Sequence, residues 1–242
     1  MVTTEPGQLL AVWEAGLPLH HGGRALLLHR AARPGSADEE LRSSPVGARA
    51  ADLLLLRRAL FGERLQVLVE CSACAEAMEF DLDVDGLAEH PSERELQVSE
   101  DGYLVEFRLP TVADLEVAAA GGTAEERRLR LLSRCTLSAV HDGEPVGCEV
   151  LPERVQRRMA ELAEQADPAA ELTLSVSCPE CGHTTPSALD IATYLWSELD
   201  AWARDVLLDV HLLASAYGWT EPSILALSPL RRRYYLELCA DA

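Results

Sequence analysis

Two C-x-x-C pairs restrict the fold of this chain more than any other feature of its sequence. The first pair reads CSAC at residues 71–74, and the second reads CPECGH at residues 178–183. A short alternating apolar segment, which is typical of a β-strand, directly precedes each pair. A strand that ends in a tight turn aims two thiolates at one point, and two such turns complete the tetrahedral shell of a zinc ribbon. The sequence therefore predicts that one structural zinc ion is held by Cys71, Cys74, Cys178 and Cys181.

The two pairs lie far apart along the chain. There are 103 residues between Cys74 and Cys178, whereas a compact ribbon has about 15 to 20 between its pairs. The predicted site would therefore join two distant parts of the chain. Two alternatives remain open: a site in which His183 or Cys148 replaces one ligand, and thiol pairs that stay reduced and bind no metal.

The second pair is the more specific of the two signals. Gly182 directly follows it and lets backbone amides turn toward the sulfurs, whereas Ala75 stands at the corresponding place after the first pair. The three remaining cysteines, Cys135, Cys148 and Cys239, are interpreted as small buried apolar side chains, because free cysteine is commonly interior.

Nothing in the sequence predicts a reaction centre. Four thiolates close the shell of a zinc ion, whereas a catalytic zinc keeps one position open for water. A thioredoxin-like redox role needs a C-x-x-C that opens a helix in a βαβ setting, which neither pair fits well. The usual phosphate, dinucleotide, hydrolase and metalloprotease signatures are absent. We therefore expect a protein that is not an enzyme, with redox chemistry at the cysteine pairs as a competing hypothesis.

The charge of the chain bears on its partners. It carries 40 acidic residues against 21 basic ones, all of them Arg, and its formal net charge is -19. Such a molecule repels a phosphate backbone, so we expect no nucleic-acid partner. The alternative function that this argues against is a zinc-ribbon nucleic-acid-binding or transcription accessory protein. No apolar run is long enough to span a membrane and the start lacks a secretory signal, so we expect no membrane contact and a cytoplasmic location.

The pattern of elements predicts an α+β fold: a helical bundle-like protein with a small zinc-ribbon-like β element built from two strand and cysteine units. Residues 1–62 form an N-terminal helical region, residues 63–110 the first strand and cysteine unit, residues 111–170 a helical middle region, and residues 171–242 the second cysteine unit with the C-terminal helices. A helix is expected between Pro152 and Pro168. The longest helix should begin at a capping box formed by Ser187 and Asp190 and end at Gly218.

The C-terminal third carries a family resemblance. The long helix ends in a Tyr217-Gly218-Trp219 turn, a new helix begins near Glu221, and the following segment reads ILALSPLRRRYYL at residues 224–236. In these features the chain resembles the T4-type phage baseplate hub assembly chaperone family, whose relatives also occur beside contractile injection systems. The first 110 residues, with their own C-x-x-C, look like the form found in contractile-injection-system clusters.

The resemblance implies a role in baseplate assembly, either as a chaperone or as a minor baseplate component. Its partners would be baseplate or tail structural proteins, and it supplies no catalytic residues. The candidate partner-binding residues are Trp219, Arg231, Arg232 and Tyr235, since aromatic and Arg side chains dominate protein interfaces. Packing in the core, and a solvated Arg face over aromatic rings, are the alternative uses of these side chains.

Overall fold

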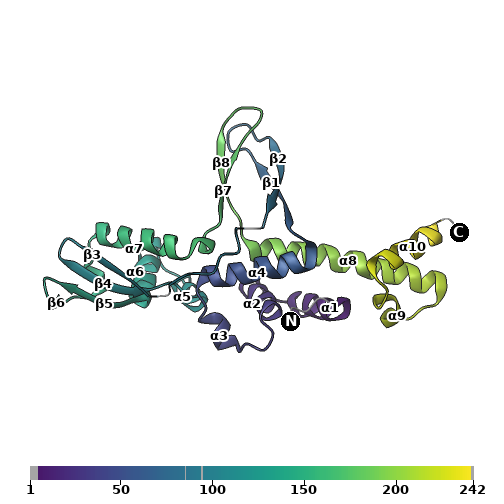
Figure 1. Cartoon of the computed structure of the whole chain (residues 1–242), viewed down its shortest axis with the longest axis horizontal. Helices are drawn as coiled ribbons and strands as arrows, with labels where there is room; N and C mark the ends of the chain where they lie inside the picture. The colour runs from purple at the N-terminus through teal and green to yellow at the C-terminus, as the bar shows by residue number, and fades with distance from the viewer. Residues whose placement is uncertain (1–4, 85, 94, 241–242) are drawn as a thin grey trace. The chain divides into compact units, whose positions relative to one another are not determined.

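The computed structural model describes residues 5–84, 86–93 and 95–240 (Figure 1). Helices and strands are both present, which confirms the α+β class. The chain divides into two compact units, one formed by residues 1–34 with 191–242 and the other by residues 35–190. Of the four regions proposed from the sequence, residues 63–110 and 111–170 lie within the second unit, whereas residues 1–62 and 171–242 each span both units, because the first unit joins both ends of the chain.

The first unit consists of helices. Its elements are α1 (Pro6–Gly16), α2 (His21–Ala32), α8 (Ile191–Tyr217), α9 (Glu221–Leu225) and α10 (Pro229–Ala240). The helix α8 contacts each of the other four. Its apolar positions advance by threes and fours, so that residues such as Leu195, Leu199 and Leu213 fall on one buried face.

The two ends of α8 differ in how well the sequence predicted them. The helix ends as expected at Gly218, which has φ +67° and donates its N–H to the carbonyl of Ala214 at 2.9 Å. Its predicted start was wrong. Ser187 lies in a strand and the helix begins at Ile191, because residues 184–188 pair with a neighbouring strand instead of starting a helical turn.

The second unit contains all of the strands in the described part of the chain. Its elements are α3 (Asp38–Arg42), α4 (Val46–Phe61), β1 (Arg64–Glu70), β2 (Ala77–Asp83), β3 (Glu95–Glu100), β4 (Tyr103–Arg108), α5 (Val112–Ala118), α6 (Ala124–Cys135), β5 (Thr136–His141), β6 (Glu144–Pro145), the 3-10 turn η1 (Cys148–Val150), α7 (Glu153–Ala166), the 3-10 turn η2 (Pro168–Ala170), β7 (Thr173–Ser177) and β8 (Thr184–Ala188). Two separate hairpins, β1-β2 and β7-β8, accompany a four-stranded sheet.

The four-stranded antiparallel sheet has the order β3-β4-β5-β6. Its core side chains pack against α7, whose buried Val155 and Met159 lie one helical turn apart. The helix α7 begins after Pro152 and ends before Pro168, as predicted. The strands β5 and β6 were not expected in a helical middle region. They form there because β5 continues the ladder of β4, a partner that is distant in sequence.

A buried carboxylate joins three elements beside this sheet. Asp114, at the start of α5, accepts hydrogen bonds from both terminal nitrogens of Arg108 at 2.5 and 3.1 Å and from Nε of Arg134 at 2.7 Å. The hydroxyl of Thr111 also donates to it at 2.7 Å. The backbone N–H of Thr111 donates to the Asp114 carboxylate at 3.0 Å and the backbone N–H of Asp114 donates to the Thr111 hydroxyl at 3.3 Å, which forms a capping box that was not predicted from the sequence. Burial alone would raise the pKa of Asp114, but these hydrogen bonds outweigh it and hold the pKa well below its ordinary value.

The Asp114 network predicts a pH-dependent loss in one variant. Asp114→Asn keeps the side-chain shape but leaves two guanidinium groups without their anion, which should cost about 2–4 kcal/mol at neutral pH after allowance for the partly exposed arginines. A lowered folded pKa contributes stability above the unfolded pKa of about 4 and loses it as the pH falls toward the folded value. Urea unfolding should therefore show a smaller difference from wild type at about pH 3 than at about pH 7. An equal difference at both pH values would contradict this account.

Candidate metal centre

The two hairpins of the second unit are copies of one motif. Each position of β7-β8 follows its counterpart in β1-β2 by 107 residues, so Cys71 corresponds to Cys178 and Cys74 to Cys181. The registers agree as well, because Glu70 pairs with Ala77 as Ser177 pairs with Thr184. Figure 1 shows the hairpins side by side. Two equivalent turns are therefore presented to the same region of space.

Each turn is closed by the same backbone hydrogen bonds. The N–H of Cys71 donates to the carbonyl of Glu76 at 2.8 Å, and the N–H of Cys178 donates to the carbonyl of His183 at 2.8 Å. In both turns the residue after the second cysteine donates back to the carbonyl of the first at 2.9 Å. These bonds reverse the chain tightly and bring both thiols of a pair to the same side.

The structure brings all four predicted cysteines together. Their sulfur atoms lie within 4.8 Å of one another. The sulfur of Cys71 is 3.6 Å from that of Cys181, and the sulfur of Cys74 is 3.7 Å from that of Cys178. Four sulfurs placed about 2.3 Å from a tetrahedral metal ion are separated by about 3.8 Å. The cluster therefore has the size of a metal-binding site, and its free thiols are too far apart to be disulfides.

The cluster is half sheltered from solvent. Cys71 and Cys178 are each 2% exposed, whereas Cys74 and Cys181 are exposed. A polar contact joins the hairpins beside them, since the backbone N–H of Ser72 donates to the hydroxyl of Thr185 at 3.2 Å. Thr185 was not among the residues predicted from the sequence. The corresponding buried residue of the first hairpin is the apolar Met78, so a polar residue at this place in the second hairpin is the signal that could have indicated it.

The thiols influence each other's ionisation. Backbone hydrogen bonds from Ala73 and Cys74 lower the pKa of Cys71 to about 6. A backbone hydrogen bond from Glu76 lowers the pKa of Cys74, but the neighbouring thiols of Cys181 and Cys71 outweigh it and raise the pKa to about 12. Thiolates this close repel one another, so the four can ionise together only around a cation. The donor set is thus suited to a metal ion that favours sulfur.

The alternative ligands are placed elsewhere. Among the described residues, the four-cysteine group contains neither His183 nor Cys148. Cys148 lies at the edge of the sheet core, and Cys239 lies at the edge of the apolar cluster between α8 and α10. Cys135 is buried, and burial raises the pKa of its thiol to about 11. The interpretation of a buried apolar side chain is thus confirmed for Cys135, whereas Cys148 and Cys239 are only partly buried.

Two of the four candidate partner-binding residues belong to an aromatic cluster. Trp219 stacks on Tyr217 with ring centroids 4.7 Å apart and meets the ring of Tyr235 edge-on at 4.8 Å. This cluster packs beside the buried Leu213 and Ile224. Both Trp219 and Tyr235 are partly exposed, so their placement allows internal packing and surface contact at the same time.

The two candidate arginines differ. Arg231 is exposed, whereas Arg232 is 6% exposed and forms an ion pair with Asp209 at 3.3 Å. The buried position of Arg232 follows from the helical spacing of α10, which turns it toward α8 while its neighbours face solvent. A contact between a partner and these residues stays a prediction.

Within residues 5–84, 86–93 and 95–240, no helix combines the length and the apolar character that crossing a bilayer requires.

Comparison with known proteins relates the chain to a family. A family model described as "T4 bacteriophage base plate protein" matches residues 36–195. The matched segment includes all four cysteines, both hairpins and the four-stranded sheet, and it ends in the first turns of α8. Residues 217–236, which carry most of the resemblance noted in the sequence, lie outside it. No curated protein and no solved structure matches the chain.

The two turns predict opposite effects for a pair of substitutions. Ala75 has φ +60° and Gly182 has φ +72°, so both occupy the left-handed region that disfavours a side chain. Gly182→Ala should lower the free energy of unfolding by about 1 kcal/mol, and its new Cβ would meet no other atom within 4 Å. Ala75→Gly should be neutral or raise it by up to about 1 kcal/mol. Urea unfolding of the metal-loaded variants measures both, and changes in the same direction would refute the shared geometry.

Proposed function

The chain belongs to the T4 bacteriophage base plate protein family, and we propose that it acts in baseplate assembly as a chaperone or minor baseplate component with a structural zinc ion. The assembly would be that of a phage tail or of a phage-tail-like contractile injection system. The observation that carries the proposal is the family match, which spans about two thirds of the chain. Its proposed partners are baseplate or tail structural proteins.

The metal that best suits the cysteine cluster is zinc. A tetrahedral set of four sulfur ligands is the preferred environment of zinc and of iron in sulfur sites. Zinc has no redox chemistry and needs no further ligand once four thiolates surround it. The closed shell also supports our proposal that the protein is not an enzyme, since a water or substrate would find no open position on the ion.

The structural role follows from the sequence distance between the ligands. A metal bound by Cys74 and Cys178 closes a loop of 103 intervening residues. A cross-link around a loop of about 100 residues removes about 4–5 kcal/mol of conformational freedom from the unfolded chain. Each hairpin has only two strands and would be marginal by itself. Zinc would thus stabilise the whole second unit and the surfaces it presents.

The remaining properties favour a protein partner in a reducing compartment. The net charge of -19 disfavours nucleic acid, so a transcription accessory role has less support. None of the seven cysteines is in a disulfide, which is usual for cysteine in the cytoplasm. We therefore propose a cytoplasmic protein that binds other proteins and contacts neither nucleic acid nor membrane.

Removing the metal ligands should destabilise the protein selectively. We expect about one zinc ion per chain by elemental analysis. Cys74→Ser or Cys181→Ser should abolish this metal content and lower the free energy of unfolding by about 4 kcal/mol, as chelation of the wild type should also do. Cys148→Ser serves as the control, because its sulfur lies outside the cluster, and it should retain the metal.

Two results would count against the zinc site. One is full stability of the wild-type chain after the removal of all metal. The other is visible absorbance with stoichiometric iron, which would identify the ion as iron.

Copurification tests the assembly role. The tagged chain, coexpressed with the tail and baseplate proteins of the same genome, should bind at least one of them in a stoichiometric complex. Immunodetection in purified particles then separates the two forms of the proposal, because a minor component stays in the particle and a chaperone does not. If no tail or baseplate protein bound the chain under conditions where the complex partners are soluble, the proposed function would be wrong.

A further inference from the structure

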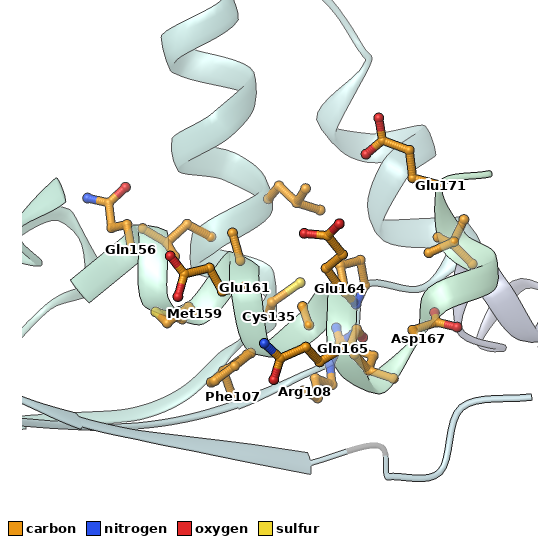
Figure 2. A pocket seen from close by; sticks show the side chains of 18 of the residues that line it. Phe107, Arg108, Cys135, Gln156, Met159, Glu161, Glu164, Gln165, Asp167 and Glu171 are labelled. Carbon is orange, nitrogen blue, oxygen red and sulfur yellow. The ribbon is translucent and has the colours of Figure 1, made fainter. Parts of the chain in front are cut away.

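The second unit contains an open pocket that the proposed zinc site does not use. It has a volume of about 1200 Å³ and lies between α6 and α7, with the end of β4 and η2 contributing to its lining. We call it the α6–α7 groove. Figure 2 shows Cys135, Met159 and Glu164 among the side chains around it. Pockets for small molecules usually measure about 300–1000 Å³, so this one is large enough for a segment of a macromolecule.

The inner surface of the groove is apolar. The helix α6 contributes Leu131, Leu132 and Cys135, which lie on one helical face, and α7 contributes Met159. The thiol of Cys135 is neutral because burial raises its pKa, so it belongs to this apolar surface. Leu115 of α5 also lines the groove and is 37% exposed. Cys135 and Met159 are already buried and form the floor of the groove. Covering the partly exposed Leu115, Leu131 and Leu132 would remove apolar surface from water, which favours binding.

One end of the groove is acidic. Glu161, Glu164 and Glu171 line it along the second half of α7 and beyond, and Figure 2 shows the carboxylate of Glu164 between those of Glu161 and Glu171. Glu161 pairs with Arg158 at 2.8 Å, but no described residue forms an ion pair with Glu164 or Glu171. This end coincides with the C-terminus of α7, where the helix dipole is negative and the last turn carries no basic residue. A cation placed here would be stabilised by all of these charges.

The other end of the groove is electrically balanced. Glu153 pairs with Arg157 at 3.3 Å. Arg128 donates to Glu125 at 2.7 Å and to the side chain of Gln156, on α7, at 2.7 Å. The groove is therefore polarised along α7, from a neutral end near Glu153 to an acidic end beyond Glu161.

We propose that the α6–α7 groove binds an amphipathic helix of another baseplate or tail protein. The apolar stripe of that helix lies on the inner surface of the groove, and its Lys or Arg side chains lie over Glu164 and Glu171. The proposal rests on the proposed function for the class of partner, and on charge complementarity for the chemistry of the bound helix. An acidic helix, or a nucleic acid, would be repelled by the same end of the groove.

A designed peptide tests the proposal on the full zinc-loaded chain. The probe is a fluorescein-labelled 18-residue helix with a Leu stripe and Lys residues near one end. A second peptide carries Glu in place of each Lys. Fluorescence anisotropy should show binding of the Lys peptide that weakens as salt is added, and binding of the Glu peptide at least about tenfold weaker. Equal binding of both peptides would overturn the proposal.

Two double variants with equal changes of charge show whether the Lys peptide binds at the groove or is attracted to the acidic surface of the chain in general. Glu164→Arg with Glu171→Arg should weaken binding of the Lys peptide about tenfold or more. Glu79→Arg with Asp81→Arg changes the net charge equally at exposed positions of β2 and should change binding by less than about threefold. If the two double variants weakened binding equally, attraction to the whole acidic surface would explain the data and the groove would be excluded.

A neutral substitution tests the apolar part of the groove. Ala160 is exposed on α7 and lines the groove, so Ala160→Trp should fill the space and weaken binding about tenfold without any change of charge. Unchanged affinity in this variant would overturn the proposal. Circular dichroism and metal content, measured for every variant, show whether the fold is retained.

Sedimentation tests whether a second copy of the chain occupies the groove. The chain's own α10 has exposed Leu230, Tyr234 and Leu238 together with exposed Arg231, so a second copy could fill the groove. We expect no self-association that depends on Glu164 and Glu171, and such self-association would overturn the proposal in favour of a second copy. The peptide assay contains no baseplate protein, so its failure would remove the groove and leave the proposed function to the copurification test.

Discussion

Four sulfur atoms that point at one place set the strictest geometric requirement in this protein. The cross-hairpin separations of 3.6 and 3.7 Å match the edges of a metal tetrahedron, and each depends on a turn whose backbone is fixed by two hydrogen bonds. Neither hairpin can satisfy this requirement alone, since each supplies two thiols. The sheet, α6 and α7 all lie in the chain between the two hairpins. Correct placement of the sulfurs therefore requires this whole intervening segment to fold.

The interior of that segment relies on charge as well as on apolar packing. Asp114 is buried and connects β4, α5 and α6 through Arg108, Thr111 and Arg134. A buried carboxylate with this many donors fixes the angles between elements more strictly than apolar contacts do. The position of α6 relative to the sheet follows from it. A partly apolar surface stays open between α6 and α7.

These features fit the proposal of a scaffold that presents surfaces to other proteins. The family relation connects the second unit with phage baseplates. The cysteine cluster holds two ends of this unit together and has the ligand chemistry of a closed metal shell. The strong negative charge limits non-specific association and favours partners that carry complementary basic groups. The proposals thus place stabilisation at the cysteine cluster and recognition at the α6–α7 groove, two different parts of the same unit.

The sequence by itself determined the local features: the two strand-and-turn units, the limits of α7 at Pro152 and Pro168, and the end of α8 at Gly218. These depend on periodicity and turn chemistry among residues a few positions apart. It also predicted that Cys71, Cys74, Cys178 and Cys181 meet, because two C-x-x-C pairs that each follow a strand are typical of a zinc ribbon. Only the tertiary structure decided that β5 joins β4, that Asp114 gathers two arginines, and that a polarised groove lies beside α7. Each of these depends on contacts between residues distant in sequence, and local patterns do not select one such partner among many.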